Sequence, residues 1–149
     1  MKIPKDITDK HLQTALCAGR VIRRITAFQD GDQSLKRLII LTNDNEKAIL
    51  AVTTTTNLSE RKYYNKDDIL IKANQEKSFE YDTYIQLHRV FELKVEILKE
   101  EYNKMQLNDL GKISDPLLND IYSVVEQSEL IEQKYIDRIL NPHFSQKDY

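Results

Sequence analysis

The residues whose types and spacing could carry chemistry lie at the ends of two apolar runs. The first run, residues 38–41, follows Arg37, and the second, residues 48–52, leads into four threonines at 53–56. A polar turn at 43–45 separates the runs, so they are expected to be neighbouring β-strands. Such a pairing would place a permanent cation beside a threonine hydroxyl in one groove. Phosphodiester chemistry can use that pair.

The totals of the sequence describe an ordinary globular protein. Its 149 residues suggest one domain, and 40% hydrophobic with 31% charged residues is typical of a soluble chain. No apolar run approaches the roughly 20 residues of a membrane span, and the N-terminus lacks the apolar core of a signal peptide. The single cysteine, Cys17, fits a reducing compartment. We therefore expect a cytoplasmic protein that makes no membrane contact.

Positive charge is concentrated in the first quarter of the chain. Residues 1–37 carry eight Lys/Arg and four Asp/Glu, whereas residues 38–149 carry 14 and 20, within a net charge of −2. Such a region could bind a polyanion or an acidic protein segment. A solvated strand face is an equally open interpretation for the first three arginines of the group. The basic residues are Arg20, Arg23, Arg24, Lys36 and Arg37.

The chain around these runs predicts the elements that would position them. A short helix is expected over residues 6–18, ended by Gly19, and a strand over 20–28. Strands are then expected over 37–42 and 48–55, a polar loop over 57–68, a strand over 69–71 and strand-like sequence over 78–91.

The last third of the chain changes character after residue 91. Apolar residues from 91 to 105 fit the helical period, but alternation from 91 to 97 fits a strand equally well. Ser114, Asp115 and Pro116 form a helix N-cap signal, followed by an apolar helical stripe. A further helix is expected over 129–140.

These short strands with polar turns predict an α+β fold built on a small antiparallel β-barrel or sandwich, with C-terminal helices and an N-terminal helix. We divide the single domain 1–149 into an N-terminal extension (1–18), a barrel core (19–91), a final strand with C-terminal helices (92–140) and a tail (141–149).

Several familiar chemistries have no counterpart in the sequence. Three glycines cannot make a glycine-rich phosphate loop. His11, His88 and His143 lie too far apart in sequence for metal-ligand spacing, and Cys17 lies among apolar residues typical of helix packing. The sequence therefore predicts no metal and no cofactor.

From Gly19 to about Val125, the order of segments resembles the MazF/PemK-like toxins of bacterial toxin–antitoxin systems. In that family a glycine begins the first strand, an arginine precedes an apolar strand and an Asn-containing turn, and a second apolar strand ends in Thr or Ser. The matching segments are 19–22, 36–44 and 49–54. A later Gln-x-Arg-type segment is matched by 85–92, and a glycine-containing strand with a capped helix by 110–115.

The resemblance implies a small SH3-like antiparallel β-barrel with C-terminal helices, to which the N-terminal helix is an extra element. On that barrel it implies a metal-independent endoribonuclease that cuts single-stranded mRNA by attack of the ribose 2′-hydroxyl on the neighbouring phosphorus. It also implies a homodimer and an acidic antitoxin protein as partner. Arg37 corresponds to the arginine that stabilises charge on the phosphate, through paired hydrogen bonds to its oxygens. Thr54 corresponds to the hydroxyl that orients the reacting groups. His88 is the expected acid or base, because histidine titrates near neutral pH.

Further residues are expected to bind RNA. The segment 61–66 interleaves cations with tyrosines, as single-strand-binding surfaces do, although an ordinary solvated loop explains it equally. Thr53 could replace Thr54 if the register shifts by one. The expected RNA-binding residues are Arg20, Thr53, Arg61, Tyr64, Gln86 and Arg89.

Departures from the family pattern keep two other interpretations open. Leu38 stands where the family has a proline, and His88 stands where it has a second arginine. These changes favour a non-catalytic barrel that binds a protein target, as gyrase-poisoning toxins do, or binds nucleic acid passively. A regulatory protein whose barrel mediates assembly is the third interpretation.

Overall fold

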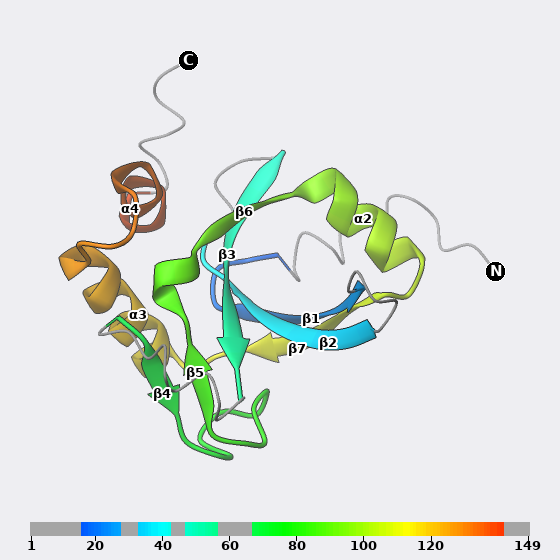
Figure 1. The fold of residues 1–149 in the computed structure, drawn as a ribbon, viewed down its shortest axis with the longest axis horizontal. Coiled ribbons are helices and arrows are strands. Elements are labelled where there is room, and N and C mark those ends of the chain that lie inside the picture. The colour runs from blue at the N-terminus through cyan, green and yellow to red at the C-terminus, as the bar shows by residue number, and fades with distance from the viewer. Residues whose placement is uncertain (1–15, 28–32, 43–46, 57–66, 142–149) are drawn as a thin grey trace.

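The fold is α+β, as expected: a curved antiparallel sheet of seven strands with three α-helices, in the part of the chain that the structure describes (Figure 1). The computed structural model describes residues 16–27, 33–42, 47–56 and 67–141. The strands are β1 (Arg20–Ala27), β2 (Gln33–Ile40), β3 (Ala48–Thr55), β4 (Ile69–Ile71), β5 (Thr83–Ile85), β6 (Phe91–Lys94) and β7 (Leu107–Lys112). The helices are α2 (Val95–Asn103), α3 (Asp115–Gln127), α4 (Gln133–Leu140) and a 3-10 turn, η2 (Leu87–Arg89).

Strand β3 is the centre of the sheet. The strand order is β4-β5-β3-β2-β1-β7, and β6 also pairs with β3. One edge of β3 pairs with β2. Its other edge is shared, with β6 along residues 48–51 and with β5 at residues 54–55. The end of β3 therefore has partners on both sides, which fixes the threonines there.

The sheet is open, so the expected closed barrel is not what the described residues form. Strands β4 and β7 are the two ends of the strand order and do not pair with each other. Side chains of the β4–β5 connection instead contact β7 and the N-terminus of α3. The Ser78 hydroxyl donates to the Leu110 carbonyl at 2.9 Å, and the Glu76 carboxylate accepts from the Ser114 amide and hydroxyl at 2.6 and 2.7 Å.

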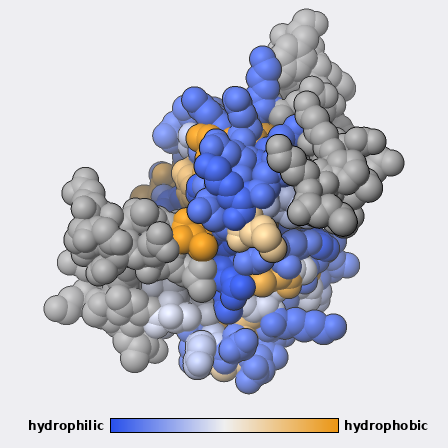
Figure 2. Space-filling view, turned by 90° about the vertical axis from the view of Figure 1, so that its right-hand side faces the viewer, coloured by the Kyte–Doolittle hydropathy of each residue, from blue (hydrophilic) through white to orange (hydrophobic). Residues whose placement is uncertain are grey.

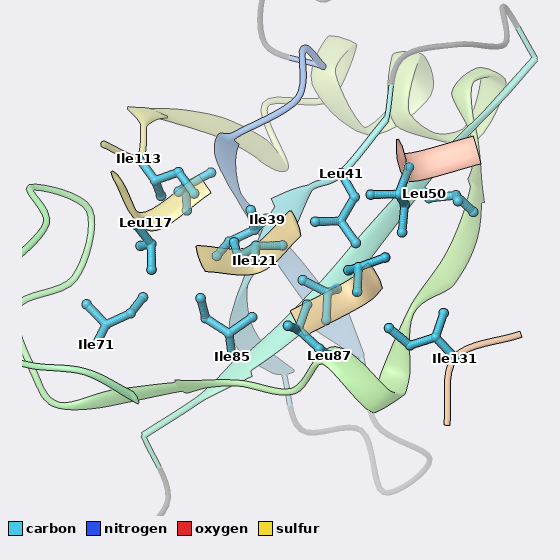
Figure 3. Close-up of a cluster of buried hydrophobic side chains, with 14 of the residues drawn as sticks. Ile39, Leu41, Leu50, Ile71, Ile85, Leu87, Ile113, Leu117, Ile121 and Ile131 are labelled. Carbon is cyan, nitrogen blue, oxygen red and sulfur yellow. The ribbon is translucent and has the colours of Figure 1, made fainter. Parts of the chain in front are cut away.

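Two apolar clusters cover the sheet, one on each face. Ile39 and Val52 point into a cluster with α3, α4 and the β4–β5 region, and Figure 3 shows side chains of this cluster directed toward one another. Leu38 and Ala51 point into a second cluster with α2 and β7. Strands buried on both faces read as continuous apolar runs. The runs at 38–41 and 48–52 have this form for that reason.

The ambiguous segment after residue 91 contains both predicted structures. Residues 91–94 form β6, and α2 begins at Val95. The predicted N-cap is confirmed, because the Ser114 hydroxyl accepts from the Leu117 amide at 3.4 Å and α3 follows. Helix α4 confirms the last predicted helix, with a later start at Gln133.

Two sequence predictions differ from the structure. The strand-like segment 78–91 is interrupted by η2 at Leu87–Arg89, where the polar Gln86 side chain turns back toward β3. Residues 16–18 form a turn rather than the end of a helix, and the rest of the predicted N-terminal helix lies outside the described residues.

The face of the molecule seen in Figure 2 is largely hydrophilic, with small apolar patches between polar residues. None of the described helices combines the length and the apolar character that crossing a membrane requires.

Candidate functional site

The antiparallel register of β2 and β3 brings two of the three predicted catalytic residues together. Leu38 pairs with Thr53, which places Arg37 opposite Thr54. Both residues line one cavity of about 300 Å³, here called the Arg37 cavity. Its lining comes from β1, β2, the end of β3 and the β4–β5 connection: Arg23, Lys36, Arg37, Thr54, Thr55, Thr56, Phe79, Tyr81 and Thr83.

Backbone carbonyls hold both side chains in place. The Arg37 guanidinium donates from Nη1 to the Ser78 carbonyl at 2.7 Å. The Thr54 hydroxyl donates to the Arg37 carbonyl at 2.8 Å, and Thr54 is 7% exposed. The hydroxyl's proton is thus engaged, while its oxygen can still accept a hydrogen bond. The Arg37 guanidinium retains further N–H groups for an anion.

The Arg37 cavity is cationic. Arg23, Lys36 and Arg37 line it, and no carboxylate is found among the described residues of its lining. Arginines elsewhere on the same strands are neutralised: Arg20 pairs with Asp109, and Arg24 donates from Nε to Glu101 at 2.8 Å. Unneutralised guanidiniums in a partly enclosed space attract anions.

An aromatic ring stands at the Arg37 cavity. Tyr81 is 68% exposed, whereas Phe79, two residues earlier, is buried in the core. An exposed ring beside a cationic cavity is the arrangement that single-stranded nucleic acids use, with cations on the backbone and rings against bases.

A second cavity of about 260 Å³ adjoins the first and shares Lys36, Thr54 and Thr55 with it. We call it the Gln86 cavity. The Thr53 hydroxyl donates to the Gln86 side-chain oxygen at 2.9 Å there. Its other lining residues are Arg24, Leu38, Arg89 and Phe91. Three of the expected RNA-binding residues, Thr53, Gln86 and Arg89, therefore lie together.

The structure places the other predicted residues elsewhere. His88 lines neither cavity, and its Nδ1 lies 2.9 Å from an Asp68 carboxylate oxygen. Arg20 also lines neither and pairs with Asp109 at the β1–β7 edge. Arg61 and Tyr64 lie outside the described residues.

Sequence reasoning missed three residues of the Arg37 cavity. Arg23 and Lys36 were assigned only to a general basic region, and Tyr81 only to a strand. The sequence placed Arg23 on the strand that precedes the one carrying Arg37, but the register that sets the two residues opposite each other comes from the structure. No sequence signal placed Tyr81, because the fold of the β4–β5 connection determines its position.

The described residues contain no group of His, Cys, Asp and Glu arranged to hold a metal ion. Among the described residues, the ionisable side chains that line the Arg37 cavity are its three cations and the Tyr81 phenol. The arrangement can bind a phosphate, orient a hydroxyl and stabilise negative charge. The sequence matches no protein-family model, and no curated protein matches it.

Proposed function

We propose that this protein is a MazF/PemK-like toxin that acts in the cytoplasm as a metal-independent endoribonuclease on single-stranded mRNA. One observation carries the proposal: Arg37 and Thr54, chosen from the order of sequence segments, line the same cationic cavity. The exposed ring of Tyr81 supports single-stranded RNA as the substrate, because stacking needs unpaired bases.

The proposed reaction is transfer of the phosphate within the RNA. The ribose 2′-hydroxyl gives its proton to water and its oxygen bonds to phosphorus, the bond from phosphorus to the 5′-oxygen breaks, and that oxygen takes up a proton from water. The products are a 2′,3′-cyclic phosphate and a 5′-hydroxyl. The Arg37 guanidinium stabilises the charge that grows on the phosphate oxygens. The Thr54 oxygen accepts a hydrogen bond from the 2′-hydroxyl and orients it.

The fold and the partners are part of the same proposal. We regard the open sheet as a divergent SH3-like barrel in which side chains take the place of closing strand pairs. The Ser78–Leu110 bond and the Glu76–Ser114 bonds support that view, since they join the β4–β5 connection to β7 and the N-terminus of α3. A homodimer and an acidic antitoxin that binds the cationic cavity complete the proposal.

The decisive experiment incubates the purified protein with single-stranded RNAs of varied sequence in excess EDTA. We expect cleavage with cyclic-phosphate ends, and a fall of at least roughly a hundredfold in Arg37→Ala, as when an oxyanion-stabilising donor is removed. Arg138→Gln is the matched control, because Arg138 pairs with Glu92 and with the carbonyl at the far end of β3.

Circular dichroism must show that both variants keep the fold. RNA that stays intact across all sequences, or full activity in Arg37→Ala, would refute the ribonuclease.

The placement of His88 favours a second candidate, a toxin-like protein that binds its target without catalysis. His88 pairs with Asp68 outside the cavity, so the expected acid or base is not beside the Arg37–Thr54 pair. This candidate predicts growth arrest on expression, with cellular mRNA intact and a protein or nucleic acid co-purifying. Loss of mRNA during the arrest would exclude it.

A further inference from the structure

The pairing of β1 with β2 creates an unusual contact between like charges. Arg23 lies directly opposite Arg37 in the register, so both side chains stand on the same face of the sheet. Like charges at directly opposite positions destabilise a sheet. The neighbouring pair, Arg24 opposite Lys36, is relieved because Glu101 neutralises Arg24. For Arg23 and Arg37, no described carboxylate does the same.

Arg23 has a side-chain donor without a hydrogen-bond partner among the described residues. Its Nε atom is buried and makes no hydrogen bond to them. A buried donor without an acceptor is unfavourable, and folded proteins contain few. Arg37, by contrast, is anchored through one nitrogen to the Ser78 carbonyl. Arg23 and Arg37 therefore present N–H groups to one cavity from two adjacent strands.

We propose that Arg23 and Arg37 form a two-guanidinium clamp that binds one phosphate group of a nucleic-acid strand. The bound phosphate accepts hydrogen bonds from the guanidiniums that line the cavity and offsets the repulsion between the two cations. Two planar forks suit a tetrahedral phosphate, because each can donate paired hydrogen bonds to its oxygens. The identification of the phosphate as part of nucleic acid rests on the proposed function, whereas phosphate binding does not.

In the proposed reaction, Arg23 helps to stabilise the charge that develops on the phosphate. A phosphodiester carries one negative charge, and attack by the deprotonated 2′-oxygen adds a second. Two cations facing the same phosphate match that doubled charge, and an interaction stronger in the transition state accelerates the reaction.

The first arm of the test needs no RNA. Thermal unfolding is followed with increasing inorganic phosphate, against chloride at matched ionic strength, for the native protein, Arg23→Gln, Arg23→Lys and Arg138→Gln. At about five times the dissociation constant, phosphate should raise the native Tm by about 2–4 °C. The Tm of Arg138→Gln should rise as much as that of the native protein, and the Tm of Arg23→Lys should rise by a smaller amount. The Tm of Arg23→Gln should rise only by the non-specific effect of phosphate on protein stability.

The second arm identifies the source of the phosphate. A 2′-O-methyl oligonucleotide, which cannot be cleaved by 2′-hydroxyl attack, is titrated against the same variants. We expect its affinity to fall roughly ten- to a hundredfold in Arg23→Gln, as for a lost charged hydrogen bond. If phosphate binding depends on Arg23 but oligonucleotide binding does not, the ligand is free phosphate and the nucleic-acid assignment fails.

These arms separate the clamp from the ribonuclease. An Arg23→Gln protein that binds phosphate and oligonucleotide like the native one overturns the clamp, even if RNA is cleaved. An Arg23-dependent response to both ligands in a protein that cleaves no RNA retains the clamp and removes the ribonuclease. Arg23→Gln should fold, because it removes a like charge beside Arg37. Arg23→Lys retains the charge, so it reports on the clamp if Arg23→Gln does not fold.

Discussion

At the scale of single residues, substitution of Tyr81 tests substrate binding without changing the cations of the Arg37 cavity. Tyr81 is 68% exposed and lines the Arg37 cavity together with three cations. We expect Tyr81→Ala to weaken binding of a single-stranded oligonucleotide by about 1–3 kcal/mol, the stacking energy of one base. Fluorescence anisotropy with a labelled oligonucleotide measures this.

Tyr81→Phe is the matched control for that prediction. It keeps the ring, so it should bind as the native protein does. Equal weakening in both variants would show that the phenol oxygen contributes rather than the stacked ring.

Residue-level prediction succeeded where strand pairing alone determines neighbours. Arg37 and Thr54 lie at the outer ends of two apolar runs joined by a polar turn, so pairing of the runs brings those ends together, whereas the exact register comes from the structure. It failed for His88, because nothing in the local sequence indicated the turn at η2 that directs His88 toward Asp68. Tyr81 was missed for the same reason, since tertiary contacts position the connection that carries it.

At the scale of elements, hydrogen bonds of Glu76 join the β4–β5 connection to the start of α3. Glu76 is buried, and its two oxygens accept from the amide and hydroxyl of Ser114, the N-cap of α3. A carboxylate at a helix N-terminus is also favoured by the helix dipole.

We expect Glu76→Ala to lower the free energy of unfolding by about 1–2 kcal/mol. Urea denaturation measures the change. Glu126→Ala, an exposed position of the same helix, should change it by less than about 0.5 kcal/mol. Equal effects of the two substitutions would contradict the role of Glu76.

Helix α3 also carries Tyr122, a tyrosine whose pKa is changed by its surroundings. Burial raises the pKa of Tyr122 above its ordinary value of 10.0. The folded protein therefore keeps this proton to higher pH than the unfolded chain does. Stability from this group is present below about pH 10 and is lost as pH rises above it, because the unfolded chain ionises first.

Urea midpoints between about pH 9 and pH 11 test this expectation. Tyr122→Phe cannot ionise at this position, so its midpoint should fall less steeply with pH than that of the native protein. Parallel slopes for the two proteins would contradict the burial effect.

Elements were predicted best where capping and punctuation are local. Ser114, Asp115 and Pro116 specify the start of α3 by themselves. The start of α2 was undecided, because residues 91–97 satisfy both periods and pairing with β3 determines where the strand ends. The apolar runs predicted strands, but they did not reveal how the ends of the sheet are arranged. A barrel was therefore expected, whereas the described strands form an open sheet with an apolar cluster on each face.

At the scale of the whole molecule, the protein is slightly acidic but carries three cations in one cavity. RNA binding should therefore depend on salt despite the net charge of −2. If three phosphates are neutralised, affinity should fall roughly 20-fold between about 50 and 200 mM salt.

Arg23→Gln should reduce the slope of log affinity against log salt by about 0.7, the share of one phosphate on a single strand. Filter binding across a salt series measures both slopes. An affinity that does not change with salt would exclude the cavity as the RNA site.

The shared edge of β3 has a consequence for the motions of the protein. Because β2 lies along one edge and β6 with β5 along the other, the central amides of β3 open to solvent only when a neighbouring strand detaches. In deuterium oxide, the amide hydrogens of β3 should therefore be among the last to exchange, well after those of β4 and β7 at the ends of the sheet. The hydroxyl of Thr54 would then rest on the slowest-opening part of the backbone.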